Sequence, residues 1–264
     1  MRFELDGNEV YASTGGREHK DGQPWLIFLH GAGSSHLVWS QQSRSFAYAG
    51  YNVLALDFPG HNLSGGEPLK SVDEQAAWVL GVMNHLGVEK ATLVGHSLGG
   101  LICLEMEHLA PGRIEKIAFV ATSYRVPVGE PLLDNADNRE QLAKNAMTAW
   151  GLGPEAHHFE NTVPGFSHIG FGLRTMDLNP EGAVAADLHA CNNYDSGEAK
   201  AAKVRCPTLC VFGGKDKMTH IKSGMKLAEA LPDNTLHILK ESGHTIPGER
   251  PHELNVFLRE FLKG

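Results

Sequence analysis

The chain has 264 residues, of which 42% are hydrophobic and 20% are charged, a composition that is typical of a globular protein and excludes a disordered one. Acidic residues outnumber basic ones and the net charge is −8, so we expect no general attraction to nucleic acid or to an anionic membrane. No apolar run approaches the ~20 residues of a membrane span. Residues 1–7 also lack the apolar stretch of a signal peptide.

None of the cysteines belongs to a C-x-x-C pair, which argues against a zinc ribbon and against thioredoxin-type redox chemistry. Cysteines of this kind, in a chain that starts without an export signal, are typical of a reducing compartment. We therefore expect a cytoplasmic protein. Cys103 falls inside an apolar helical stretch, where we expect it to pack as a small side chain.

Short apolar runs along the chain predict the strands of a sheet. They cover residues 25–29, 53–56, 91–94, 117–120, 208–212 and 235–239. Most are apolar throughout, as in parallel strands that helices cover on both faces. Apolar residues at helical spacing occur between them, in residues 72–86, 98–109, 218–231 and 249–262. The alternation predicts a three-layer α/β fold with a mostly parallel sheet, and residues 3–12 predict an added hairpin that turns at Asp6 and Gly7.

One long segment interrupts this alternation. Residues 124–203 contain no strand-like run, and they include short helical patches such as residues 139–150. A segment of this length is far too long for an ordinary connection between two elements. We therefore predict a core domain made of residues 1–123 and 204–264, with a helical insertion of residues 124–203 between two strands of the sheet.

Residues 95–99 read G-H-S-L-G and fit the pattern G-x-S-x-G. An apolar strand leads into this motif and a helix starts directly after it. So sharp a turn brings its two arms close together, which explains the small residues Gly95 and Gly99. The turn presents the hydroxyl of Ser97 above the sheet, at the positive end of a helix. A glycine-rich turn with an incidental serine is the competing interpretation, and the flanking strand and helix argue against it.

A serine hydroxyl is a poor nucleophile without an adjacent base, and His244 has the position expected for one. It lies in the turn after the last predicted strand and before the last helix, whereas His30, His61 and His96 lie elsewhere. The predicted catalytic residues are therefore Ser97 and His244, together with a carboxylate that orients the imidazole.

Asp216 is the candidate for that carboxylate. It follows the predicted strand 208–212 and so lies at the carboxyl edge of the sheet, as Ser97 does. Its alternative role is to cap the helix that starts near Met218. The chain order Ser97, Asp216, His244 favours the catalytic interpretation.

With these residues the chain resembles the α/β-hydrolase superfamily over essentially its whole length. Residues 30–33, H-G-A-G, resemble the H-G-x motif of that family, in which the residue after H-G donates a backbone N–H to the oxyanion hole. The resemblance implies Ala32 as one oxyanion donor and Leu98, which follows the serine, as the second. It also implies that the insertion 124–203 is a cap domain over the substrate pocket. We expect His30, Gly31, His96 and Trp150 to contact the substrate.

Residues 57–64 are similar to the family's D-x-x-G-x-G-x-S turn, and they depart from it at Asn62, where glycine is usual. The departure is expected to alter the loop without touching the serine, histidine and aspartate. Asp57 precedes the serine in the chain, so we assign it the structural role of capping its own turn.

The implied activity is hydrolysis of a small carboxylic ester through an acyl-enzyme. His244 would take the proton of Ser97, Asp216 would hold His244, and the oxyanion would be bound by Ala32 and Leu98. This chemistry needs no metal and no organic cofactor, and we expect a monomer or a homodimer. Short to medium acyl chains are expected because the insertion offers only scattered apolar residues: Leu132, Leu133, Met147, Trp150, Phe159, Phe166, Ile169, Phe171 and Met176.

Other activities share this scaffold and stay open. The C–C hydrolases of aromatic breakdown keep the serine, aspartate and histidine, but they usually have an aromatic residue after the histidine, where this chain has Thr245. They also use a basic residue for the substrate carboxylate, which here would be Arg125 or Arg174. Cofactor-free haloperoxidases, or perhydrolases, are esterase relatives. A ligand-binding receptor of the same fold is the alternative that is not an enzyme.

Overall fold

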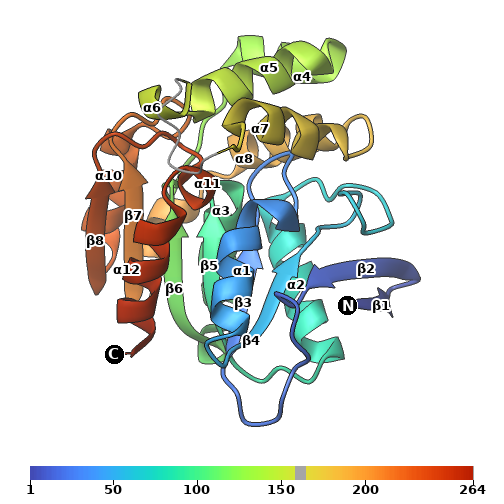
Figure 1. Ribbon diagram of the computed structural model, residues 1–264, viewed down its shortest axis with the longest axis vertical. Helices are drawn as coiled ribbons and strands as arrows, with labels where there is room; N and C mark the ends of the chain where they lie inside the picture. Colours follow the sequence, from blue (N-terminus) through green and yellow to red (C-terminus); the bar gives the residue numbers. More distant parts are fainter. Residues whose placement is uncertain (158–164, 264) are drawn as a thin grey trace.

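A computed structural model describes residues 1–157 and 165–263, and its strands form a single sheet (Figure 1). Within these residues the sheet has eight strands, in the order β1-β2-β4-β3-β5-β6-β7-β8. They are β1 (Arg2–Leu5), β2 (Asn8–Ser13), β3 (Trp25–Leu29), β4 (Asn52–Leu56), β5 (Ala91–His96), β6 (Ile114–Val120), β7 (Thr208–Gly213) and β8 (Asn234–Leu239). Strands β3 to β8 pair in parallel, which confirms the predicted mostly parallel α/β sheet.

The predicted hairpin is the antiparallel edge of this sheet. Strands β1 and β2 pair across a two-residue turn at Asp6 and Gly7, whose φ angles are 52° and 77°. Two positive φ angles in succession are the hallmark of the hairpin turn that matches the natural twist of its strands. Strand β2 then pairs antiparallel with β4 and joins the hairpin to the parallel sheet.

Helices cover both faces of the sheet, and side chains that alternate along each strand supply the two cores. On one face Ile27 and Leu29 of β3 pack with α2 (Val72–His85), α3 (Leu98–Leu109) and α10 (Ile221–Ala230). On the other face Leu26 and Phe28 pack with three further helices, which are α1 (Ser40–Ala47), α11 (Ile246–Glu249) and α12 (Pro251–Lys263). No helix in the described ranges combines the length and the apolar character needed to cross a bilayer.

The segment between β6 and β7 is helical in its described residues and lies over the carboxyl edge of the sheet (Figure 1). Its helices are α4 (Glu130–Asn138), α5 (Glu140–Gly151), α6 (Pro154–His157), α7 (His168–Asp177), α8 (Ala183–Asn193) and α9 (Gly197–Ala201). A third apolar cluster, which includes Leu132, Met147 and Leu188, joins α4, α5 and α8. Helix α8 contributes Leu188 to this third cluster and Cys191 to the main core, whereas the final helix α9 contributes Ala201 to the main core alone. We call residues 124–193 the cap.

The order of the strands reverses at β3, which pairs with β4 on one side and with β5 on the other. In an open α/β sheet, such a reversal opens a crevice beyond the carboxyl ends of the two diverging strands. Two loops border the crevice here: residues 30–34 after β3, which we call the H-G loop, and the turn after β5, which carries Ser97.

Ser97 forms the whole turn between β5 and α3, with φ 53° and ψ −117°. The main chain on either side has no room for side chains. A Cβ atom on Gly95 would lie 2.3 Å from the carbonyl oxygen of Gly99, and one on Gly99 would lie 2.2 Å from that of Leu29. The strained serine is held by hydrogen bonds from its N–H to the Val120 carbonyl, at 3.0 Å, and from the Thr122 hydroxyl to its own carbonyl, at 2.7 Å.

This packing predicts the effect of a methyl group at the turn. Gly99→Ala should lower the free energy of unfolding by about 1–3 kcal/mol, the usual cost of overpacking, because α3 has to move away from β3. Gly112→Ala is the matched control, since its added Cβ would meet nothing within 4 Å. Urea denaturation of both variants measures the difference. Equal stabilities would show that the close approach at Gly99 is not a constraint.

Candidate active site

Asp216 and His244 meet at the carboxyl edge of the sheet. Asp216 lies in the loop after β7, and its Oδ2 accepts a hydrogen bond from Nδ1 of His244 at 2.8 Å. Its other oxygen, Oδ1, accepts the backbone N–H groups of Met218 and Thr219, both at 2.8 Å. Asp216 therefore binds His244 and also caps its own loop, but the helix expected to start near Met218 begins only at Ile221 (α10), with His220 as its N-cap. The two backbone bonds also fix the orientation of the carboxylate.

His244 lies between β8 and α11 and is buried. Because Nδ1 donates to a carboxylate, Nε2 is the nitrogen left to accept a proton. The backbone holds the residue on two sides: its N–H donates to the Gly151 carbonyl of the cap at 2.7 Å, and its carbonyl accepts Nε2–H of His96 at 2.9 Å. His244 and Ser97 line the same cavity, so the candidate base and the candidate nucleophile face one shared space.

His96, for which substrate contact was predicted, lines this cavity, but it mainly supports its neighbour. Its ring packs against the ring of His244, with 4.8 Å between centroids, and edge-on against Trp39. Burial, together with the nearby His244, lowers the pKa of His96 to about 3, so its ring stays neutral. Among the described residues its Nδ1 has no hydrogen-bond partner. His96 therefore holds the backbone of His244 without competing as a base.

The expectation that His30 contacts the substrate is wrong. Its side chain is fully buried beneath the H-G loop and does not line the cavity. Nδ1 donates to the Gly31 carbonyl at 2.9 Å, and Nε2 accepts the N–H of Phe58 at 3.4 Å. Burial and the charge of His61 lower the pKa of His30 to about 4. Both ring nitrogens are thus used inside the fold, which sequence position alone does not reveal.

The H-G loop brings Gly31 and Ala32 to the cavity wall beside Ser97. A Cβ atom on Gly31 would lie only 3.1 Å from the Cβ of Ser97, which shows how closely the loop approaches the serine. Leu98 is the first residue of α3, and the N–H groups of a first helical turn have no acceptor within the helix. Of the two residues expected to donate to the oxyanion, Ala32 therefore lies at the cavity wall, and Leu98 directly follows Ser97 at the start of α3.

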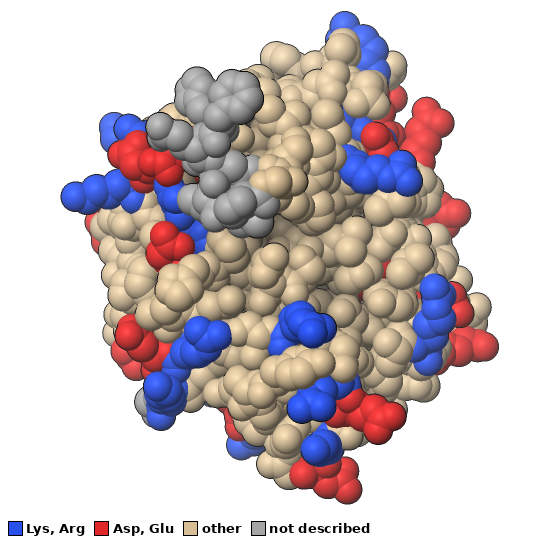
Figure 2. Space-filling model, viewed as in Figure 1, with Lys and Arg blue, Asp and Glu red and all other residues tan. Residues whose placement is uncertain are grey.

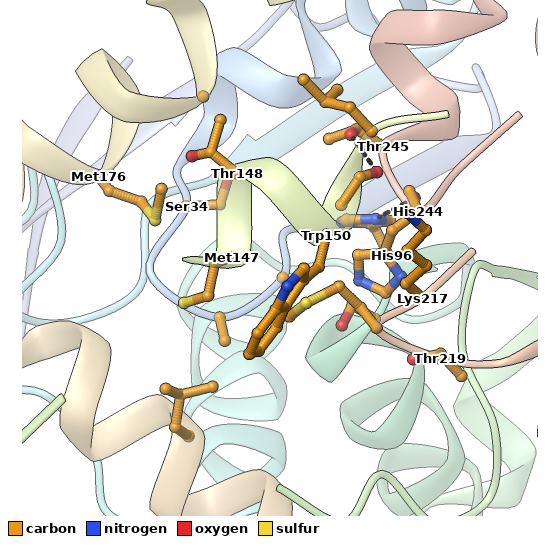
Figure 3. A pocket seen from close by; sticks show the side chains of 18 of the residues that line it. Ser34, His96, Met147, Thr148, Trp150, Met176, Lys217, Thr219, His244 and Thr245 are labelled. Carbon is orange, nitrogen blue, oxygen red and sulfur yellow. Dashed lines mark hydrogen bonds between the residues drawn. The ribbon is translucent and has the colours of Figure 1, made fainter. Parts of the chain in front are cut away.

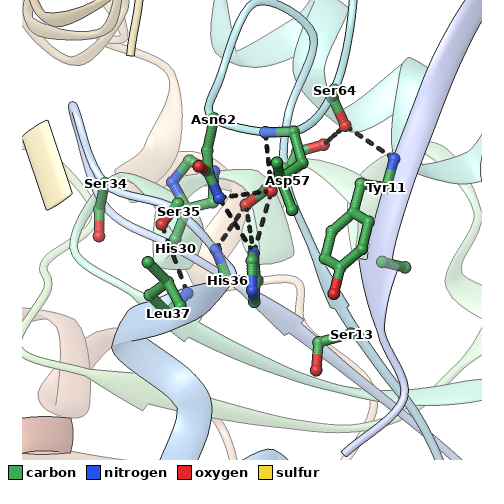
Figure 4. Close-up of polar contacts among 12 residues, drawn as sticks. Tyr11, Ser13, His30, Ser34, Ser35, His36, Leu37, Asp57, Asn62 and Ser64 are labelled. Atoms are coloured by element: carbon green, nitrogen blue, oxygen red, sulfur yellow. Dashed lines mark hydrogen bonds and ion pairs between the residues drawn. The ribbon is translucent and has the colours of Figure 1, made fainter. Parts of the chain in front are cut away.

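Asp57 organises its own turn, as predicted (Figure 4). Its carboxylate accepts the backbone N–H of His36 at 2.7 Å and the side-chain amide of Asn62 at 3.0 Å. Burial alone would raise the pKa of Asp57, but the hydrogen bonds and charge of His36 outweigh it, and the pKa is lowered. Asn62, in the place of the usual glycine, adopts a φ of 43°. Asparagine tolerates this conformation, and its amide strengthens the turn.

The cavity beneath the cap has a volume of about 370 Å³ and is mainly apolar. Trp150, for which substrate contact was predicted, lines the cavity and projects from α5 beside His96 and His244 (Figure 3). Of the other apolar residues expected there, Leu133, Phe166 and Ile169 do not line the cavity, and Phe159 lies outside the described residues. Those that do line it are Leu132, Met147, Phe171 and Met176.

Some residues of the cavity wall were not identified from the sequence. Lys217 follows Asp216 and is the one Lys or Arg side chain among the described residues of the wall; neither Arg125 nor Arg174 reaches it. The hydroxyls of Thr148 and Thr219 are buried there, without a hydrogen-bond partner in the described part of the chain. Nothing in local sequence marks these positions, because the cap brings them together only in three dimensions.

Comparison with known proteins places this arrangement in a family. The model of the alpha/beta hydrolase family matches residues 26–256. The 2-hydroxy-6-oxo-6-phenylhexa-2,4-dienoate hydrolase of Comamonas testosteroni is 26% identical over 90% of this chain and 87% of its own, and a putative esterase/lipase of Haemophilus influenzae is 24% identical over 90% and 83%. The enol-lactonase of Burkholderia xenovorans LB400 superposes over the whole of both chains, with a TM-score of 0.89 and 22% identity. With the family's fold and a match across most of its length, the chain belongs to the alpha/beta hydrolase family.

Proposed function

We propose that this hydrolase cleaves carboxylic esters of short to medium acyl chains, with Ser97 as nucleophile, His244 as general base and Asp216 as the residue that orients it. The hydrogen bond of 2.8 Å between Asp216 and His244, at a cavity that Ser97 also lines, carries the proposal. It supplies a base with a free Nε2 at the same cavity as the Ser97 hydroxyl.

The first half of the reaction forms an acyl-enzyme. Nε2 of His244 takes the proton of the Ser97 hydroxyl as its oxygen attacks the ester carbonyl. The negative charge that develops on the carbonyl oxygen is met by the N–H groups of Ala32 and Leu98, each worth about 3 kcal/mol in the barrier. His244 then gives its proton to the departing alcohol.

Water completes the cycle. His244 takes a proton from a water molecule, which attacks the acyl group on Ser97 and releases the acid. In both halves the carboxylate of Asp216 stabilises the imidazolium that forms. Because its Oδ1 is held by two backbone N–H groups, Asp216 keeps its alignment while the charge on the imidazole changes.

The character of the cavity favours a neutral substrate. Apolar side chains dominate its wall, and on the face seen in Figure 2 charges of both signs are interspersed without a continuous patch of either. One observation favours a second candidate, which is hydrolysis of a substrate that carries a carboxylate, because Lys217 reaches the cavity wall. The similarity to the dienoate hydrolase of Comamonas testosteroni supports keeping this candidate.

For the proposed function, the first prediction concerns the nucleophile. Ser97→Ala should reduce ester hydrolysis by several orders of magnitude and leave the fold intact, because only the backbone carries the strain of the turn. A fluorophosphonate should label the wild type on Ser97, and mass spectrometry of the labelled peptide identifies the site. Ser34→Ala is the matched control, since Ser34 also lines the cavity. Turnover of Ser97→Ala near that of the wild type would exclude the mechanism.

The second prediction concerns the acid. In Asp216→Asn the amide oxygen must accept the backbone N–H groups that Oδ1 now accepts, so the amide NH₂ faces Nδ1 of His244 and selects the wrong tautomer. Turnover of an activated ester should fall by about 10⁴, as for the same change in other triads. Glu241→Gln is the control, because Glu241 is exposed and pairs with the exposed Lys215 at 4.0 Å. If Glu241→Gln lost most of its turnover while Asp216→Asn stayed active, the acid would be Glu241 and not Asp216.

The third prediction separates the two candidate substrates. Among p-nitrophenyl esters, we expect kcat/KM to be highest for acetate to octanoate and to fall for palmitate, because the cavity has a limited volume. We expect kcat/KM to be lower for the anionic hemisuccinate than for butyrate, because the cavity wall is apolar. Lys217→Gln should leave the neutral esters unchanged. A preference for hemisuccinate that disappears in Lys217→Gln would favour the second candidate instead.

A further inference from the structure

The cap grips the H-G loop at the residue next to Ala32. The N–H of Gly33 donates to Oδ2 of Asp187, in helix α8, at 2.8 Å. The carbonyl of the same residue accepts the side-chain amide of Asn179, which follows α7, at 2.7 Å. Both polar groups of Gly33 are therefore bound by cap side chains, and the peptide that joins it to Ala32 cannot rotate without breaking a buried hydrogen bond.

Packing reinforces this grip. Gly33 has a φ of 63°, and a Cβ atom there would lie 2.8 Å from Val184, one turn before Asp187 in α8. Helix α8 thus lies directly on the main chain of the H-G loop. Asn179 also accepts the N–H of Asn62 at 3.0 Å, which ties the neighbouring core turn to the same part of the cap.

Asp187 carries its charge into the interior, where His61 balances it. Nε2 of His61 donates to Oδ2 of Asp187 at 3.0 Å, and Nδ1 donates to the Pro59 carbonyl at 3.0 Å. A ring that donates from both nitrogens is an imidazolium. Burial lowers the pKa of His61, but Asp187 outweighs burial and the pKa is raised above its usual value. The side chains of the pair are almost completely buried, with 0% and 1% exposure.

The net charge of the pair formed by Asp187 and His61 matters because Asp187 binds the residue next to Ala32. A buried carboxylate next to an oxyanion donor would repel the negative charge that develops there, and burial strengthens such repulsion. The imidazolium of His61 makes the pair neutral. The other titratable groups that face His61 are Asp57, in the turn after β4, and His30, which is neutral. Gln75 of α2 completes the contacts by donating to Oδ1 of Asp187 at 3.2 Å.

We propose that Asp187 is a positioning residue through which the cap sets the geometry of the oxyanion donor Ala32, with His61 as its neutralising partner. This inference rests on the proposed function, because it assigns Ala32 a role in the reaction. The cap then has a second task besides enclosing the substrate, since the oxyanion site is assembled only while α8 is seated on the H-G loop.

The test compares two substitutions at one position. Asp187→Ala removes the acceptor of Gly33, so kcat should fall by about 10²-fold, as for an ångström-scale misplacement of a catalytic group, while KM changes little. Asp187→Asn should retain kcat within a few-fold at neutral pH. Its amide oxygen can accept Gly33 and His61, and Gln75 can turn its Oε1, which has no partner in the described residues, toward the new NH₂.

The pH dependence of kcat distinguishes positioning by Asp187 from a role in stability alone, which would leave that dependence unchanged. In the wild type, kcat should fall as the pH rises through the raised pKa of His61, because deprotonation leaves the charge of Asp187 unbalanced beside the oxyanion. Asp187→Asn should lack this fall. The matched control is Asp137→Ala, which breaks an exposed pair of the same chemistry within the cap, between Asp137 and His189 at 3.0 Å. Its kcat and its pH profile should equal those of the wild type.

Amide hydrogen exchange of residues 31–36 keeps this test separate from that of the proposed function. Exchange there should accelerate in Asp187→Ala and stay slow in Asp187→Asn, whatever the substrate of the enzyme is. If the wild type hydrolyses no ester, the proposed function fails while the exchange result still reports on the grip. If Asp187→Ala does not fold, Asn179→Ala replaces it, with the same expected direction in kcat and in exchange. A folded Asp187→Ala or Asn179→Ala with wild-type kcat and wild-type exchange would overturn the inference.

Discussion

The close approach of two backbones at Ser97 is the constraint on which the rest of the site depends. Strand β5 passes close to helix α3 at Gly95, and α3 passes close to the end of β3 at Gly99, so neither glycine has room for a Cβ atom. The serine between them takes a φ of 53°. Such strain persists only where surrounding contacts over-determine it. Here Val120 of β6 and Thr122 supply those contacts. As a result, the hydroxyl of Ser97 is presented at the carboxyl edge of the sheet, at the start of α3.

The sequence was most informative where periodicity and glycine carry the signal. The apolar runs predicted β3 to β7 because strands buried on both faces have few alternatives, and a similar run predicted β8, although this edge strand is only half-buried; the glycines marked the turn at Ser97. Helix α1 was not predicted, because its sequence is mostly Ser and Gln and only tertiary contacts, such as that from Gln42 to the Pro247 carbonyl at 3.2 Å, hold it. His30 was misjudged because a histidine in a motif looks the same whether it faces the cavity or the core.

The contacts between the cap and the core could not be predicted from the sequence either, because they join residues that are far apart in the chain. The carbonyl of Gly151 accepts the N–H of His244, and Oε2 of Glu249 accepts the N–H groups of Gly153 and Gly243, each at 3.0 Å. The end of α5 is thereby bonded to the loop that carries the proposed base. No pattern of spacing predicts such bonds, because each involves a backbone group that every residue possesses.

Besides Asp216, the buried carboxylates of Asp57, Asp187 and Glu249 share one way of acting at this edge of the sheet. Each accepts at least one backbone N–H group: Asp57 from His36, Asp187 from Gly33 and Glu249 from Gly243. Burying a charge costs more free energy than its partners usually return, so such groups are weak evidence for added stability. What they supply is direction, because a carboxylate that binds two or three N–H groups admits few loop conformations. The strained turn presents Ser97 to the cavity, and these carboxylates fix the conformations of the loops that surround it.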